Sequence, residues 1–158
     1  MKESGDFSIR PFDPSDLNYI CGIEQRSFPN PWSKFEFTLS YLRNPRGFKV
    51  VEKKQKIVGY VIAEVVTQRN KKRREGHLLN LAVDPEFRRR GVGTMMLEEI
   101  TEHLQQENAA AIWLETRASN SAAINFYLKM GFQEKGRRRH YYPNEDAVVM
   151  VKTLKGKG

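Results

Sequence analysis

The sequence has few of the residues that cross-link a chain, anchor it in a membrane or bind metal. Its single cysteine, Cys21, cannot form a disulfide within the chain, and we interpret it as a small core residue. No apolar run approaches the ~20 residues that span a membrane, and the N-terminal segment lacks the apolar stretch of a signal peptide. We therefore expect a soluble, cytoplasmic protein with no membrane partner.

Histidines are also few. The three of them, His77, His103 and His140, have none of the spacings that are typical of metal ligands. The sequence therefore predicts no metal site.

Positive charge, in contrast, is abundant, and the net charge is +8. This charge favours an anionic partner such as nucleic acid, the ribosome or a phosphorylated cofactor, but it does not choose among them. The chain has 158 residues, of which 39% are hydrophobic and 29% charged, a composition that suits one globular domain over residues 1–158.

The hydrophobic pattern predicts an alternation of strands and helices. Asp13 is a candidate cap for a helix that begins near Pro14, and Ser33 and Glu36 form a candidate capping box for a second helix. Strands are expected at 7–12, 48–52, 56–67, 77–83, 110–116, 133–139 and 147–154, and further helices at 92–107 and 120–131, with a basic loop at 68–75. This order predicts an α/β domain with a mixed, mostly antiparallel sheet flanked by helices.

One short segment, "FRRRGVGT", combines an arginine run with two glycines at the start of a predicted helix. The first N–H groups of a helix have no partner within it, and Gly91 and Gly93 would let a phosphate approach them closely. The segment lacks the G-K-[S/T] ending of a Walker loop and the third glycine of a dinucleotide fingerprint. A tight turn beside solvated arginines is the alternative interpretation.

Arg88, Gly91 and Gly93 match the R/Q-x-x-G-x-G/A signature, and the segment resembles that of the GNAT acetyltransferase superfamily. The resemblance implies a GNAT fold whose loop amides hold the pyrophosphate of acetyl-CoA and whose preceding strand pairs with the pantetheine arm. The cofactor-binding residues implied are Leu81, Ala82, Val83, Arg88, Arg89, Arg90, Gly91, Val92, Gly93, Thr94, Asn120 and Tyr127.

Three more segments, "EQRSFPNPWS", "IWLETRASNSAAINFYLKMGF" and "YYPNEDAVVM", are similar to those of ribosomal-protein alanine acetyltransferases and archaeal N-terminal acetyltransferases. With them the resemblance covers nearly the whole chain. It implies direct transfer of an acetyl group from acetyl-CoA to the α-amine of a protein N-terminus, with ribosomal proteins among the candidate substrates.

Glu115 is a carboxylate in an apolar strand, where a charge is costly without a task or a partner. The alternative to a catalytic role is an ion pair with Arg117 or another neighbour. The resemblance assigns Glu115 the role of general base and Tyr127 the role of general acid that protonates the CoA thiolate. By its position alone, Tyr127 would be a core residue. His77 is a third candidate for proton transfer, because histidine titrates near neutral pH.

Asn120 is a candidate helix cap as well as an implied cofactor contact. Tyr141 and Tyr142 are expected in a hairpin link over 141–146, where they would either pack on the sheet edge or bind the peptide. The resemblance favours peptide binding, together with Phe28, Pro29, Trp32 and Glu115.

Two alternative functions stay open at this point. The same fold could acetylate a lysine side chain or a small amine. A nucleic-acid or ribosome-binding module would instead use the basic segments 70–75, 88–90 and 136–142, but the sequence has no recognisable RNA-binding motif and such a module would leave the glycine loop unexplained.

Overall fold

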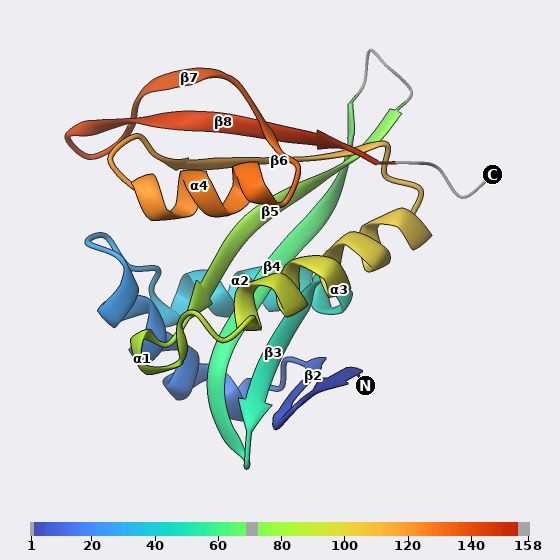
Figure 1. The fold of residues 1–158 in the computed structure, drawn as a ribbon, viewed down its shortest axis with the longest axis vertical. Helices are drawn as coiled ribbons and strands as arrows, with labels where there is room; N and C mark the ends of the chain where they lie inside the picture. The colour runs from blue at the N-terminus through green and yellow to red at the C-terminus, as the bar shows by residue number, and fades with distance from the viewer. Residues whose placement is uncertain (1, 69–72, 155–158) are drawn as a thin grey trace. The chain divides into compact units, whose positions relative to one another are not determined.

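The computed structural model describes residues 2–68 and 73–154 (Figure 1). The strands pair in the order β1-β2-β3-β4-β5-β6-β8-β7. The strand β5 pairs with β6 in parallel, and the pairs β1–β2, β2–β3, β3–β4, β6–β8 and β7–β8 are antiparallel. The predicted mixed, mostly antiparallel sheet is therefore confirmed.

The strands are β1 (Lys2–Ser4), β2 (Phe7–Pro11), β3 (Phe48–Lys53), β4 (Lys56–Gln68), β5 (Arg73–Val83), β6 (Ala111–Arg117), β7 (Gln133–Tyr142) and β8 (Glu145–Thr153). The helices are α1 (Leu17–Ser27), α2 (Lys34–Arg43), α3 (Val92–Gln106) and α4 (Ser121–Lys129), and the short 3-10 turns are η1 (Pro14–Asp16), η2 (Pro45–Gly47) and η3 (Pro85–Phe87). The strand β1 had no counterpart among the predicted elements.

The chain divides into two compact units. The first contains residues up to 64 and 80–103, and the second contains the described residues of 65–79 and of 104 onward. The strands β4 and β5 each contribute residues to both units. A single domain over residues 1–158 stays a prediction.

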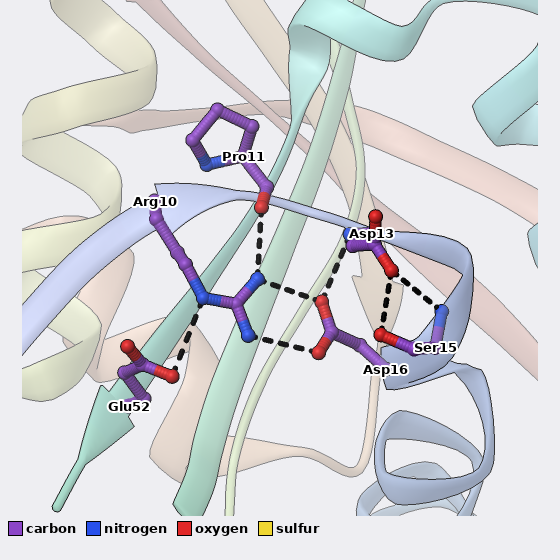
Figure 2. Close-up of polar contacts among 6 residues, drawn as sticks. All are labelled: Arg10, Pro11, Asp13, Ser15, Asp16 and Glu52. Carbon is purple, nitrogen blue, oxygen red and sulfur yellow. Dashed lines mark hydrogen bonds and ion pairs between the residues drawn. The ribbon is translucent and has the colours of Figure 1, made fainter. Parts of the chain in front are cut away.

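In the first unit, Asp16 holds the turn η1 that precedes α1 (Figure 2). It is buried, and both of its oxygens accept hydrogen bonds of 2.8 Å from the guanidinium of Arg10. Asp16 also accepts the main-chain N–H of Asp13, while Asp13 accepts that of Ser15, each at 2.9 Å. The predicted cap at Asp13 is thus confirmed, although Pro14–Asp16 form a 3-10 turn and the α-helix begins only at Leu17.

The other helices of the first unit also follow their sequence signals. The N–H of Glu36 donates to the hydroxyl of Ser33 at 3.1 Å, which caps α2 as predicted. The helix α3 buries Val92, Met96 and Ile100 along one face. A Cβ added at Gly59 of β4 would lie 3.2 Å from Met96, so glycine allows this helix and strand to pack closely.

In the second unit, α4 follows β6 in the chain and precedes β7. Asn120 caps this helix by accepting the N–H of Ala123 at 3.1 Å. The helix ends before Gly131, whose φ of +96° is the left-handed conformation expected of a C-cap glycine. The predicted cap and stop of this helix are both confirmed.

The predicted basic loop at 68–75 needs a correction. Residues 69–72 lie outside the described residues, but Arg73, Arg74 and Glu75 belong to β5, which begins four residues before the predicted strand. The carbonyl of Arg74 accepts the N–H of Ala110 at 2.8 Å. Main-chain pairing therefore overrides the polar composition that suggested a loop.

The tyrosine pair also lies in a strand rather than in a link. Tyr141 and Tyr142 end β7, and Tyr142 pairs with Glu145, so Pro143 and Asn144 alone form the turn. The pairing of β7 with β8 is irregular between Arg138 and Tyr142, where His140 has a φ of +53°. This irregularity lets the strand continue beyond the predicted end at residue 139.

Among the described residues, no helix combines the length and the apolar character needed to cross a membrane.

Candidate active site

In the first unit, the glycine segment takes the form that the sequence predicts. Gly91 has a φ of +84°, α3 begins at Val92, and the N–H of Met95 donates to the carbonyl of Gly91 at 3.0 Å. The N–H groups ahead of Met95 thus lie at the positive end of the helix dipole, the usual geometry of an anion site. A Cβ added at Gly91 would have no atom within 4 Å among the described residues, so this approach to the backbone is open.

The arginines of this segment have different roles. Arg88 donates to the carbonyl of Val83 at 3.3 Å and to the hydroxyl of Ser27 at 3.4 Å, so it ties the segment to the end of β5 and to the end of α1. The guanidinium of Arg90 lies over the ring of Phe87, 5.3 Å from its centroid. Arg89 is exposed and has a φ of +64°.

The segment between α1 and α2 carries three predicted peptide-binding residues. Phe28 is half-buried, Pro29 is exposed, and the half-buried Trp32 packs against Phe37 with 5.2 Å between ring centroids. One more residue, which was not predicted, contacts this segment. Glu24, 1% exposed, accepts the main-chain N–H of Trp32 at 2.9 Å. Its position four residues after Ile20, on the buried face of α1, is the sequence signal that could have identified it.

In the second unit, His77 and Glu115 form a close pair. His77 Nε2 lies 2.6 Å from Glu115 Oε1, and the Glu115 side chain is only 6% exposed. The strand pairing sets His77 of β5 beside Trp113 of β6, and the two rings stack with their centroids 3.6 Å apart. The stack holds the imidazole against the strand that carries Glu115.

Two more groups surround Glu115. The guanidinium of Arg138 lies 3.8 Å from Glu115 and 5.7 Å from the centroid of Trp113, and the hydroxyl of Tyr141 hydrogen-bonds to Glu115. Burial alone would raise the pKa of Glu115, but the hydrogen bond and charge of His77, helped by Arg138 and Tyr141, outweigh it and lower that pKa. Glu115 is therefore ionised at neutral pH.

Arg117, the ion-pair partner considered for Glu115, pairs with Glu145 at 2.9 Å. Its guanidinium also lies 4.4 Å from the ring centroid of Tyr142. Burial, followed by the neighbouring Tyr141, raises the pKa of Tyr142 to about 12. Glu115 does form an ion pair with a neighbour, Arg138, as the alternative interpretation allowed, and it also contacts His77.

Tyr127 is 8% exposed and contacts the rings of Phe126 and Phe132 at centroid distances of 5.2 and 5.5 Å. Burial, followed by the nearby Tyr142, raises the pKa of Tyr127, so its hydroxyl keeps its proton at neutral pH. The packing agrees with the core interpretation, and the retained proton suits a general acid.

The family model described as Acetyltransferase (GNAT) family matches residues 17–132, well over half of the chain. The chain belongs to the GNAT acetyltransferase family.

Two curated relatives of this GNAT chain are similar over nearly their whole lengths. The [ribosomal protein bS18]-alanine N-acetyltransferase of Escherichia coli (strain K12) is 36% identical over 148 residues, covering 91% of this chain and 95% of that protein. The N-alpha-acetyltransferase of Sulfurisphaera tokodaii is 31% identical over 161 residues, covering 97% of this chain and 96% of that protein.

A solved structure agrees with these relatives. The crystal structure of the ribosomal-protein-S18-alanine N-acetyltransferase from Escherichia coli has a TM-score of 0.80 and 33% identity, and the match covers 96% of this chain and 97% of that one. The predicted GNAT fold and the predicted activity, acetyl-CoA-dependent N-terminal acetylation, are confirmed.

For a GNAT enzyme, the structure brings together some predicted residues and adds others. Within the second unit, His77, Glu115 and Tyr141 meet, and Trp113 and Arg138 join them although neither was predicted. The alternation of β6 sets Trp113 on the same face as Glu115, a signal that the sequence did contain. No group of three or more potential metal ligands occurs among the residues described.

Proposed function

We propose that this acetyltransferase moves the acetyl group of acetyl-CoA directly to the α-amine of a protein N-terminus, in a ternary complex and with no acyl-enzyme. The observation that carries the proposal is the His77–Glu115 pair, an ionised and nearly buried carboxylate held by a histidine at 2.6 Å. A site that must take a proton from an amine needs such a group.

The pyrophosphate and the pantetheine arm of the cofactor are assigned to residues of the first unit. The loop from Arg88 to Thr94 binds the pyrophosphate through its backbone, because the helix N-terminus and the open approach at Gly91 fit an anionic group. The main chain of Leu81–Val83 pairs with the pantetheine arm. Gly76 and His77 of β5, which pair with β6, come before these three residues in the chain.

Glu115 acts as the base. A free N-terminal amine has a pKa near ~7.7–8.0 and is partly protonated at pH 7. Glu115, through a water molecule, accepts the ammonium proton, so that the amine nitrogen can attack the acetyl carbonyl carbon. His77 and Tyr141 orient the carboxylate.

Tyr127 acts as the acid. As the bond between the acetyl carbon and sulfur breaks, the thiolate leaves with the electron pair, and the Tyr127 hydroxyl gives it a proton. The attacking nitrogen loses its second proton to solvent, which gives the neutral amide, and the Tyr127 phenolate regains a proton from solvent. Burial keeps this hydroxyl protonated until that step. Asn120 is assigned a cofactor contact in addition to its role as the cap of α4.

Each unit carries candidate contacts for the peptide: Phe28, Pro29 and Trp32 in the first unit, and Tyr141, Tyr142 and Glu115 in the second. A ribosomal protein is the first substrate to test, since the Escherichia coli relative is named for the alanine of bS18. The proposal locates the enzyme in the cytoplasm, a reducing compartment that suits its lone thiol, Cys21.

The test compares two kinds of peptide under steady-state conditions, with CoA release as the measurement. One set has free N-termini with varied first residues, and the matched set has blocked N-termini and one internal lysine. We expect turnover of the free peptides and little turnover of the blocked ones. Equal rates on both sets would instead favour acetylation of lysine side chains.

A further inference from the structure

Glu24 is a titratable residue that the proposed chemistry does not use. It lies in the last turns of α1 and is 1% exposed. Its carboxylate accepts three hydrogen bonds: from the main-chain N–H of Trp32 at 2.9 Å, from the side-chain amide of Asn80 at 2.9 Å, and from the hydroxyl of Tyr60. All three donors are neutral groups, and their hydrogen bonds satisfy a carboxyl group that is almost wholly buried.

The same residue holds both ends of the segment that joins α1 to α2. The main-chain carbonyl of Glu24 accepts the N–H of Phe28 at 3.0 Å, where the segment leaves α1. The side chain accepts the N–H of Trp32, one residue before the cap Ser33 of α2. Residues 28–32 are therefore fixed at their first and last positions by one amino acid.

We call this arrangement, Glu24 holding residues 28–32, the clamp. Aromatic contacts connect Trp32 back to Glu24 and so form a closed ring of contacts. Trp32 packs on Phe37 at 5.2 Å, and Phe37 meets the edge of the Tyr60 ring at 5.5 Å between centroids. Tyr60 in turn hydrogen-bonds to Glu24, which holds Trp32. Trp32 is therefore held in two ways: its main-chain N–H donates to Glu24, and its ring packs on Phe37.

We propose that Glu24 is a positioning residue for the peptide substrate. It never touches the peptide, and it acts by holding Phe28, Pro29 and Trp32 in their binding arrangement before the peptide arrives. This inference rests on the proposed function, which assigns those residues to the peptide. A segment ordered in advance loses less conformational entropy on binding, so the clamp increases peptide affinity.

The kinetic test uses two substitutions at one position. Glu24→Ala removes every side-chain acceptor, whereas Glu24→Gln keeps the length and one oxygen for the N–H of Trp32. We expect Glu24→Ala to raise the peptide KM about tenfold while the kcat and the acetyl-CoA KM change less than about twofold. Glu24→Gln should restore the peptide KM to within about threefold of the original value, because one acceptor suffices for Trp32.

Asp16→Asn is the matched control. Asp16 is another buried carboxylate of the first unit that accepts several hydrogen bonds, and no contact joins it to the described residues 28–32. This variant should lower the melting temperature and leave the peptide KM unchanged. If Glu24→Ala gives the same result as Asp16→Asn, Glu24 is a stabilising residue only and the proposal is wrong.

A second measurement needs no substitution, and so does not depend on whether the alanine variant folds. Amide hydrogen exchange by NMR should find the N–H of Trp32 strongly protected in the unmodified enzyme, since it donates to a buried carboxylate. Rapid exchange there would overturn the clamp. Failure of the enzyme to acetylate any peptide would overturn the proposed function, yet the protection of Trp32 would still be measurable.

Discussion

The candidate sites of the two units are built in different ways. In the first unit, the segment from Arg88 to Thr94 presents main-chain N–H groups, and its form depends on a glycine with positive φ and on the start of a helix. In the second unit, His77 and Glu115 are 38 residues apart in the chain and meet because β5 pairs with β6. A backbone site depends on local conformation, whereas a side-chain site depends on long-range packing and on the charges around it.

The largest expected effect is at Glu115 in the side-chain site. Glu115→Gln keeps the size and removes the basicity, so kcat should fall by roughly 10²–10⁴, the usual contribution of a general base. The defect should shrink above about pH 8, where the peptide amine is already neutral. Steady-state rates from pH 6 to 9 provide the measurement, with the exposed Glu134→Gln on β7 as the control. A small loss that does not vary with pH would leave Glu115 as an ion-pair partner.

Tyr127→Phe tests the second catalytic assignment in the same unit. The substitution removes one hydroxyl and keeps the ring that packs on Phe126 and Phe132. We expect kcat to fall about ten- to a hundredfold with little change in the peptide KM, since a proton donor acts mainly in the transition state. Full kcat would return Tyr127 to a purely structural role.

Gly91→Asp tests the backbone site. A carboxylate beside the main-chain N–H groups should repel the pyrophosphate and weaken acetyl-CoA binding about tenfold or more. Gly91→Ala is the control, because it shares the strain of a φ of +84° but adds no charge, and its Cβ meets no described atom within 4 Å. Calorimetry should find a clearly larger loss for aspartate than for alanine. Equal affinities would exclude this loop as the anion site.

His77→Phe tests whether His77 controls the pKa of Glu115. Phenylalanine keeps an aromatic ring that can stack on Trp113, but it cannot hold a proton. Burial raises the pKa of Glu115, and His77 is the main influence that lowers it. The pKa of Glu115 should therefore rise in the variant. We expect the acid limb of the pH–rate profile to move to higher pH, with kcat at pH 8 reduced by less than about tenfold.

The same shift has a consequence for stability. A carboxylate whose pKa is lowered by folding stabilises the native state above its unfolded pKa, and this contribution is lost as the pH falls through the folded value. Without His77 the contribution is smaller, so acid unfolding should begin at a higher pH in the variant. Circular dichroism during acid titration measures it, and coincident curves would show that His77 does not control the pKa of Glu115.

The smallest expected effect is at Asn120, where a backbone role and a ligand role overlap. Asn120→Ala removes the cap of α4 and should lower the stability by about 1 kcal/mol in thermal or urea unfolding. Asn120→Asp retains a capping oxygen and is the control. If acetyl-CoA affinity is also reduced in the alanine variant, Asn120 contacts the cofactor. An unchanged affinity would leave the cap as its only role.

The sequence by itself determined all four α-helices, the strands apart from β1, and the backbone features that depend on near neighbours. The cap at Ser33, the cap at Asn120 and the left-handed glycine at Gly131 all involve residues a few positions apart, so their geometry follows from local propensity. The form of the glycine segment before α3 likewise depends on residues a few positions apart. The four resembling segments likewise gave the family, which the comparisons confirm.

Only the tertiary structure decided which side chains meet. The stack of His77 on Trp113, the approach of Arg138 to Glu115 and the clamp of Glu24 on Trp32 depend on strand register and helix packing. Pairing also extended β5 back to Arg73 and carried β7 through Tyr142, against the polar and turn-like composition of those segments. The physical reason is that a hydrogen-bonded neighbour strand satisfies backbone groups whatever side chains they bear, and no local pattern records where that neighbour lies.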